Sequence, residues 1–198
     1  MIDMEQYGGR RAYAAHIRSR VLNALGAYRV AHSIEWDMAA RLVFVCKGNI
    51  CRSPYAKFRA RQHGACTASF GLEAMEGAGA NEKASRVALH RGIDLSDHQS
   101  TQLKEPLILR GDLIVVFEPW QMREVRRHNF SGLAGVTLLG IWARPNRPHI
   151  QDPYGRSDQY FQNCFSVIDL NLRVLLAHLA AHKAPAVMSR DRRTKGCP

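Results

Sequence analysis

The strongest constraint on the fold comes from short apolar runs that alternate with helical patterns along most of the chain. The run at 112–117 begins with an acidic residue and is otherwise apolar, which is typical of a strand buried on both faces of a parallel sheet. Alternating strands and helices predict such a sheet, with right-handed crossovers. We expect strands at 41–45, 66–70, 112–117 and 136–139, and helices at 53–63, 82–91, 119–128 and 157–182. The predicted fold class is therefore α/β: a three-layer sandwich with a central four-stranded parallel sheet, preceded by an extra N-terminal helical extension.

Length and composition indicate one globular domain with charged ends. The chain has 198 residues, of which 46% are apolar, enough for one well-buried core. We place the main domain at 41–182, a basic helical extension at 1–40 and a basic, disordered tail at 183–198. Much of the net charge of +11 comes from these ends, since residues 8–34 carry five arginines and no acid. The body is only mildly basic, which disfavours a nucleic-acid partner.

The sequence gives no sign of a membrane span, a secretory signal or a metal site. No run approaches the roughly 18 apolar residues that a membrane span requires, and no cleavable segment opens the chain. The five cysteines, an odd number, do not suggest a disulfide framework, and no Cys/His spacing is typical of zinc. We therefore expect a cytoplasmic protein that needs neither a metal nor a cofactor.

The extension carries one helical apolar stripe whose contact surface the sequence leaves open. Its apolar residues recur at spacings of three and four within 10–30: Tyr13, Ile17, Val21, Leu25 and Tyr28. The arginines lie mostly elsewhere on the helix. Such a helix could lie on its own domain, on a partner, or on an anionic membrane surface. Docking on its own domain is the commoner outcome.

The loop that follows the first predicted strand has residue types that suit an anion. Cys46 and Arg52 are separated by five residues, among them Gly48 and Asn49, which tolerate positive φ and can line up N–H groups into an anion-binding nest. Ser53 is expected to cap the next helix, whose positive end would then lie under the loop. In that field the Cys46 thiol should ionise readily, and Arg52 can hold two phosphate oxygens. Taken alone, the spacing also fits a buried cysteine at a strand end.

The whole stretch resembles the signature of a known family. It reads Val45-Cys46-Lys47-Gly48-Asn49-Ile50-Cys51-Arg52-Ser53-Pro54. This sequence matches, at every fixed position, the pattern Val-Cys-x-Gly-Asn-Ile-Cys-Arg-Ser-Pro of the low-molecular-weight protein tyrosine phosphatases. The predicted strand before it and helix after it are the right context. The resemblance covers about 41–182 and implies that Cys46 is the nucleophile, and that the phosphate is held by Arg52 with Lys47, Gly48, Asn49, Ile50, Cys51 and Ser53.

Phosphoryl transfer from tyrosine also needs an acid, because the conjugate acid of the leaving oxygen has a pKa of about 10. Asp152 is the candidate, followed by Pro153, which restrains its backbone. An Asp-Pro pair alone is a common turn. Read together with the Cys46 loop, it resembles the family's Asp-Pro-Tyr acid loop, and Tyr154 would then offer an aromatic wall to a substrate ring. We call residues 144–155 the acid loop.

Some supporting positions are assigned by the resemblance alone. Three residues look like the partners that hold the family's asparagine, here Asn49, in an unusual backbone conformation: Ser53, Ser69 and His98. Without the resemblance, His98 would be taken for a capping or surface histidine. Cys51 looks like the family's second cysteine, able to form a reversible disulfide with Cys46, or else a small residue packed inside the loop.

Four positions depart from the family pattern. Lys47, often uncharged in the family, would line the mouth of the site and favour acidic or multiply phosphorylated substrates. Met75 stands where many members have Trp, which would make that substrate wall softer. Gly155 replaces a second aromatic residue, and Glu118 stands where an aspartate is usual. These changes bear on substrate choice rather than on the chemistry.

The resemblance implies a metal-independent protein tyrosine phosphatase with a phosphocysteine intermediate and Asp152 as the general acid. Its partner would be a phosphotyrosine protein, and bacterial members often act with tyrosine kinases of polysaccharide export. Alternatives are a phosphate-binding module without turnover, or a phosphatase for phosphoarginine or small aryl phosphates. Ile50 favours phosphotyrosine, since members that act on phosphoarginine tend to have Thr there. Arsenate reductases with this fold need a downstream cysteine pair, and residues 110–150 contain no cysteine.

Overall fold

The structure is a computed structural model that describes residues 5–187 of the chain. Its strands are β1 (Arg41–Cys46), β2 (Thr67–Gly71), β3 (Asp112–Val116) and β4 (Gly135–Leu138). Its α-helices are α1 (Arg10–Ala24), α2 (Arg52–Gln62), α3 (Glu82–Leu89), α4 (Pro119–Arg127) and α5 (Asp158–Val187). Short 3-10 helices are η1 (Glu5–Tyr7), η2 (Arg29–His32), η3 (Trp36–Met38), η4 (Glu105–Leu107) and η5 (Leu139–Ile141). All the strands and helices predicted for the main domain are present, with ends shifted by a few residues.

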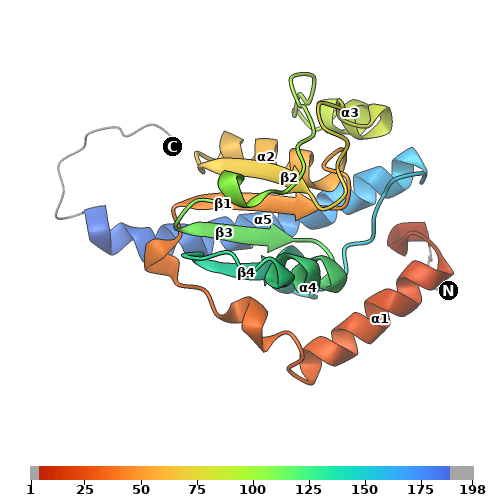
Figure 1. The fold of residues 1–198 in the computed structure, drawn as a ribbon. Coiled ribbons are helices and arrows are strands. Elements are labelled where there is room, and N and C mark those ends of the chain that lie inside the picture. The colour runs from red at the N-terminus through yellow and green to blue at the C-terminus, as the bar shows by residue number, and fades with distance from the viewer. Residues whose placement is uncertain (1–4, 188–198) are drawn as a thin grey trace.

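The four strands form one parallel sheet in the order β2-β1-β3-β4 (Figure 1). Val45 near the end of β1 pairs with Phe70 of β2 on one side and with Val116 of β3 on the other. Because β1 and β3 lie in the centre, they are almost wholly buried, which explains their uninterrupted apolar sequences. All four strands end at the same edge, where ligands bind in sheets of this kind.

Helices cover both faces of the sheet and complete the three layers. On one face, α2, α3 and α5 pack on a core that includes Phe44 and Val115 of the central strands. On the other face, Met122 and Val125 of α4 pack in a core with Val45. The predicted α/β class and the parallel four-stranded sheet are therefore confirmed.

The last helix corrects two expectations. The segment Asp158–Lys183 is long and apolar enough to cross a membrane, judged by its length and its mean hydropathy of 1.5. The sequence did not suggest such a segment, because polar residues interrupt its apolar ones. Here Phe161 and Phe165 pack in the core, so this segment serves as a core helix of the sandwich. α5 also continues to Val187, past the predicted start of the tail. The rest of the predicted tail, residues 188–198, lies outside the described residues.

The N-terminal helix α1 docks on its own domain, but not through the predicted apolar stripe. Its buried residues are small or polar: Ala12, His16 and Ser19. Three residues of the stripe are exposed instead: Ile17, Val21 and Leu25. The helix is also shorter than the predicted 10–30 and ends at Ala24, because Gly26 adopts a positive φ of 81° that breaks it.

Candidate active site

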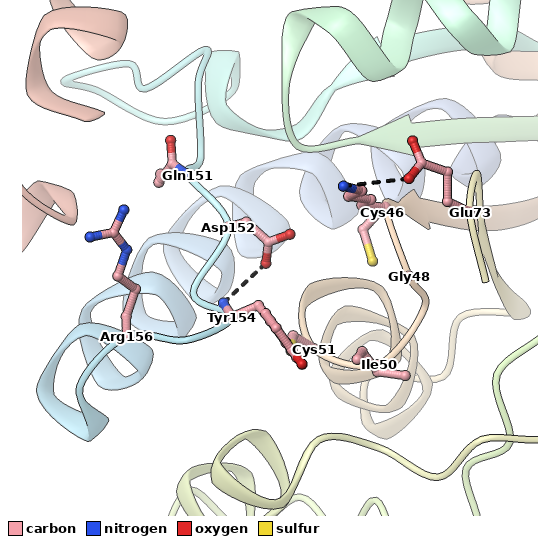
Figure 2. Close-up of a pocket in the computed structure, with 10 residues that line it drawn as sticks. Cys46, Gly48, Ile50, Cys51, Glu73, Gln151, Asp152, Tyr154 and Arg156 are labelled. Atoms are coloured by element: carbon pink, nitrogen blue, oxygen red, sulfur yellow. Dashed lines mark hydrogen bonds and ion pairs between the residues drawn. The ribbon is translucent and has the colours of Figure 1, made fainter. Parts of the chain in front are cut away.

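The predicted phosphate loop lies at the carboxyl edge of the sheet, between β1 and α2, and borders a pocket of about 320 Å³. Figure 2 shows Cys46 of this loop and Asp152 of the acid loop facing the same space. The pocket is lined by Cys46, Lys47, Gly48, Ile50, Cys51, Glu73, Gln151, Asp152, Tyr154 and Arg156. The fold thus brings together two segments that are far apart in the sequence.

The side chain of Asn49 ties the loop to its surroundings. Asn49 has a φ of 54°, in the left-handed region that asparagine adopts more readily than most residues. Its Nδ2 donates to Ser53 Oγ at 2.8 Å and to Ser69 Oγ at 3.1 Å. Its Oδ1 accepts from the backbone N–H of Thr101 at 2.9 Å, a partner that the sequence did not suggest. These bonds connect the loop to α2, to β2 and to the segment after α3.

His98 completes the support of Asn49 from the main-chain side. Its Nε2 lies 2.6 Å from the carbonyl oxygen of Asn49, so this nitrogen carries the proton and donates. Burial lowers the pKa of His98, which keeps the ring neutral. The three predicted partners Ser53, Ser69 and His98 are all in contact with Asn49.

Cys46 contacts a hydroxyl within the loop. Its Sγ lies 3.0 Å from Ser53 Oγ, and both residues are buried. Ser53 is therefore not the predicted N-cap: α2 begins at Arg52, its N-cap is Cys51, and no side chain caps it, because the Ser53 hydroxyl turns inward. Gly48, also predicted to favour positive φ, does not adopt it. The uncapped N–H groups at the start of α2 suit an anion in the loop.

The Arg52 side chain is fully buried and is fixed through one of its nitrogens. Nη1 donates to Glu118 Oε1 at 2.5 Å and to the carbonyl oxygen of Ile150 at 2.9 Å. Nη2 lies 2.7 Å from Asp152 Oδ2, but within residues 5–187 neither Nη2 nor Nε has a well-directed hydrogen bond. Burial opposes the charge, but Asp152 and Glu118 outweigh it and raise the pKa of Arg52. In the described part of the chain, two nitrogens of this cation therefore lack a directed hydrogen bond, and one of them, Nη2, is ion-paired with Asp152.

The acid loop places Asp152 and Tyr154 on the opposite side of the pocket from Cys46 (Figure 2). Asp152 Oδ1 accepts from the backbone N–H of Tyr154 at 3.2 Å, so the carboxylate closes its own turn. The Tyr154 side chain is exposed and lines the pocket, as a wall for a substrate ring would.

Met75, the other predicted wall, does not line the pocket. Its side chain is 77% exposed, and its carbonyl oxygen accepts from the hydroxyl of Ser100. Glu73, two residues earlier, lines the pocket instead. In this structure Met75 is thus turned to solvent rather than into the pocket, and its role as a softer substrate wall stays a prediction.

Charged residues surround the mouth of the pocket. Lys47 Nζ lies 3.4 Å from Glu73 Oε2, and both side chains are more than half exposed. The charge that Lys47 brings to the mouth is thus partly offset, a contact that the sequence did not suggest. Arg156 lines the pocket from the far side of the acid loop (Figure 2).

Two further cysteines lie near the site. Cys46, Cys51 and Cys164 are free thiols and are buried. Burial first, then the charge of Asp152, raises the pKa of Cys51. Burial also raises the pKa of Cys164 to about 12. Both therefore stay protonated at neutral pH, and the predicted disulfide between Cys46 and Cys51 stays a prediction.

The fold and the site together define an α/β protein with a thiol at the centre of an anion-binding loop. A profile of the family described as low molecular weight phosphotyrosine protein phosphatase matches residues 41–185. A probable low molecular weight protein-tyrosine-phosphatase, AmsI of Erwinia amylovora, is 37% identical over 134 residues, which are 67% of this chain and 92% of the relative.

Solved structures of proteins from the same family are similar to this chain. The crystal structure of Erwinia amylovora AmsI, a tyrosine phosphatase, has a TM-score of 0.65 and 34% identity, and the match covers 72% of this chain and 94% of that one. Vibrio vulnificus Wzb in complex with benzylphosphonate has a TM-score of 0.63 and 29% identity, and the match covers 70% and 97%. The chain belongs to the low molecular weight phosphotyrosine protein phosphatase family, whose members are cysteine-dependent hydrolases. The span that matches the profile begins at residue 41, so the extension lies outside it.

Proposed function

We propose that this protein hydrolyses phosphotyrosine in proteins through a phosphocysteine intermediate. The observation that carries the proposal is the presence in one loop of Cys46, which lines the pocket, and of the buried Arg52, whose Nε and Nη2 lack a directed hydrogen bond in the described part of the chain. A phosphoryl group held at the loop would supply equatorial oxygens to both nitrogens and to the N–H groups at the start of α2.

In the first step, the Cys46 thiolate attacks phosphorus and the bond from phosphorus to the tyrosine oxygen breaks. Arg52 and the loop N–H groups stabilise the charge on the equatorial oxygens, which supplies without a metal the positive charge that the transition state needs. Asp152 gives its proton to the departing oxygen, so tyrosine leaves as the neutral phenol. In the second step, Asp152 takes a proton from water, the water oxygen attacks phosphorus, and the thiolate of Cys46 leaves.

In this scheme, the ion pair between Asp152 and Arg52 is replaced when a phosphoryl group binds. Without substrate, Nη2 of Arg52 stabilises the Asp152 carboxylate from 2.7 Å. A bound phosphoryl group takes over Arg52 and puts negative charge beside Asp152 instead. Substrate binding thereby releases the Asp152 carboxyl group from its ion pair and leaves it beside the leaving oxygen.

The site also supports phosphotyrosine over phosphoarginine. Tyr154 lines the pocket beside Asp152, where it can pack on an aromatic ring, and Ile50 stands where members that act on phosphoarginine tend to have Thr. We further propose that the enzyme works in the cytoplasm on phosphorylated proteins, a tyrosine kinase among them, and that residues 41–182 form the catalytic domain. A reducing compartment suits a thiolate nucleophile.

Hydrolysis of p-nitrophenyl phosphate in the presence of a chelator tests the proposal. We expect turnover that vanadate blocks, and a loss of at least about 1,000-fold in kcat for Cys46→Ser. Retention of a near wild-type rate in that variant would overturn the scheme. Binding of vanadate without turnover would instead identify a phosphate-binding module. Matched peptides with phosphotyrosine or phosphoarginine then decide the substrate, with Ile50→Thr expected to shift preference toward phosphoarginine.

A further inference from the structure

The N-terminal extension packs against the back of the acid loop. The guanidinium of Arg147 in that loop lies over the ring of Tyr7, 4.5 Å from its centroid. The same ring lies 4.9 Å from that of His16 on α1. Stacking of this kind fixes the direction of a long arginine side chain. Tyr7 therefore links the extension directly to the loop that carries Asp152.

A second link runs through Tyr160 on α5. A Cβ at Gly8, where φ is +86°, would lie 2.9 Å from the Tyr160 ring, so the extension passes this ring as closely as glycine allows. Burial raises the pKa of Tyr160, so its hydroxyl stays protonated and donates to the carbonyl oxygen of Gln151 at 3.4 Å. Gln151 is the residue immediately before Asp152. The extension thus covers the side chain that holds the backbone next to the proposed acid.

The contact between the extension and the loop is tightly packed. The cavity that remains between them has a volume of only about 20 Å³, about that of one water molecule, and it is bordered by Tyr7, His16, Arg147, Gln151 and Tyr160 among others. His16 is buried, and burial first, then Arg147, lowers its pKa to about 4, so it packs as a neutral ring. The side of residues 147–151 that faces the extension therefore borders Tyr7 and His16 across a narrow gap.

On its other side, the acid loop rests on the edge of the sheet. The N–H of Ile150 donates to the carbonyl oxygen of Phe117 at 2.8 Å, and Ile150 in turn accepts from Arg52. The loop is therefore clamped between the site and the extension. The span that matches the family profile starts at residue 41, so one half of this clamp is outside the matched region.

We propose that Tyr7, Gly8 and His16, here called the N-terminal brace, are positioning residues for Asp152. The brace holds the acid loop so that the carboxyl group of Asp152 is directed at the leaving oxygen. This inference rests on the proposed role of Asp152 as the general acid and adds a function for the extension. The proposal assigns the brace no role at the phosphate loop or at the nucleophile Cys46.

The dependence on the leaving group tests the brace. An acid matters for phenyl phosphate, whose leaving oxygen is strongly basic, and hardly for 2,4-dinitrophenyl phosphate, whose leaving group departs unprotonated. The quantity to measure with both substrates is kcat/KM, which reports the first chemical step. For Tyr7→Ala we expect a loss of about tenfold with phenyl phosphate and less than about twofold with dinitrophenyl phosphate, with inhibition by vanadate unchanged.

Controls separate positioning from a general loss of structure. Tyr7→Phe keeps the ring and should restore the wild-type ratio of the two substrates. Leu25→Ala, in the same extension but 75% exposed, should change neither rate. An equal loss on both substrates in Tyr7→Ala, or no loss on either, overturns the brace.

Asp152→Ala shows whether a failure belongs to the brace or to the proposed function. It should give the same pattern as Tyr7→Ala, only larger. If Asp152→Ala depends on the leaving group and Tyr7→Ala does not, the brace alone is wrong. If the loss of kcat/KM in Asp152→Ala does not depend on the leaving group, Asp152 is not the general acid, and the proposed role of the brace is wrong as well.

Discussion

Arg52 and Glu118 form a buried ion pair, with 2.5 Å between Nη1 and Oε1, and this pair fixes the orientation of the guanidinium before any ligand arrives. Glu118 Oε2 also lies 3.5 Å from His149 Nε2 in the acid loop, and the Glu118 side chain caps α4. One carboxylate thus connects the arginine, the acid loop and the start of a helix.

Removal of the Glu118 carboxylate should lower both the stability of the protein and its affinity for phosphate. In Glu118→Ala, Arg52 keeps its contacts with Asp152 and with the carbonyl oxygen of Ile150 but loses the carboxylate on Nη1, and a buried charge that loses its partner typically lowers the free energy of unfolding by about 3–5 kcal/mol. Urea unfolding measures the loss, and the inhibition constant of inorganic phosphate should rise in parallel. Glu118→Asp keeps the charge and should lose less on both measures. Equal stability of wild type and Glu118→Ala would contradict the importance of the pair.

His16 should make stability depend on pH. Its pKa in the folded protein is about 4, below the ordinary 6.5, so between these values the unfolded chain binds more protons than the folded one. Stability is therefore full above about pH 6.5 and falls as the pH drops toward 4. Thermal unfolding of His16→Phe, which cannot protonate, should show a smaller fall over this window. Besides burial, the charges of Arg147 and Arg20 lower the pKa of His16.

The comparison with the wild type is needed because burial also lowers the pKa of His98, which contributes in the same direction. Only the difference between the two proteins reports His16. Identical slopes for the two proteins from pH 6.5 to 4 would show that His16 does not protonate on unfolding.

Lys47 and Glu73 should shift preference for acidic substrates in opposite directions. Since their charges offset each other at the mouth, Glu73→Gln should raise kcat/KM for a phosphopeptide with acidic flanks by about two- to fivefold, and Lys47→Ala should lower it. Both effects should shrink at high salt, because both side chains are exposed to solvent. A neutral phosphopeptide of the same length is the control. If both variants change the two peptides alike, the mouth does not select for charge.

Asp152→Ala should retain its phosphorylated substrate. Loss of a general acid typically lowers the rate by about 100- to 10,000-fold, whereas Cys46 and Arg52 still hold the phosphoryl group. The bound phosphoprotein can then be isolated and should be released by vanadate. Arg52→Ala, which lacks the phosphate contact, should capture nothing.

Much of the main domain could be predicted from local patterns. The strand at 112–117 is apolar because β3 is buried on both faces. Asn81, directly before α3, caps it, and its side chain accepts from the N–H groups of Lys83 and Ala84. These features depend on residues close together in the sequence, which is why a pattern reveals them.

The rest depends on contacts between distant residues. Ser53 was predicted as a cap from its position, but its hydroxyl is used by Cys46 and by Asn49. The pairing of Arg52 with Glu118 joins residues 66 positions apart. The face of α1 that docks is lined by Ala12 and His16, whose fit to the acid loop no hydrophobic pattern encodes.

Asn49 keeps its left-handed conformation through hydrogen bonds to Ser53 and to the main chain of Thr101, so this part of the phosphate loop is shaped by contacts within the protein. A loop formed in this way is suited to inorganic phosphate as well as to the phosphoryl group of a substrate. Under the proposed function, free phosphate therefore competes with substrate for the same loop, and its concentration sets the fraction of molecules that can accept a new substrate.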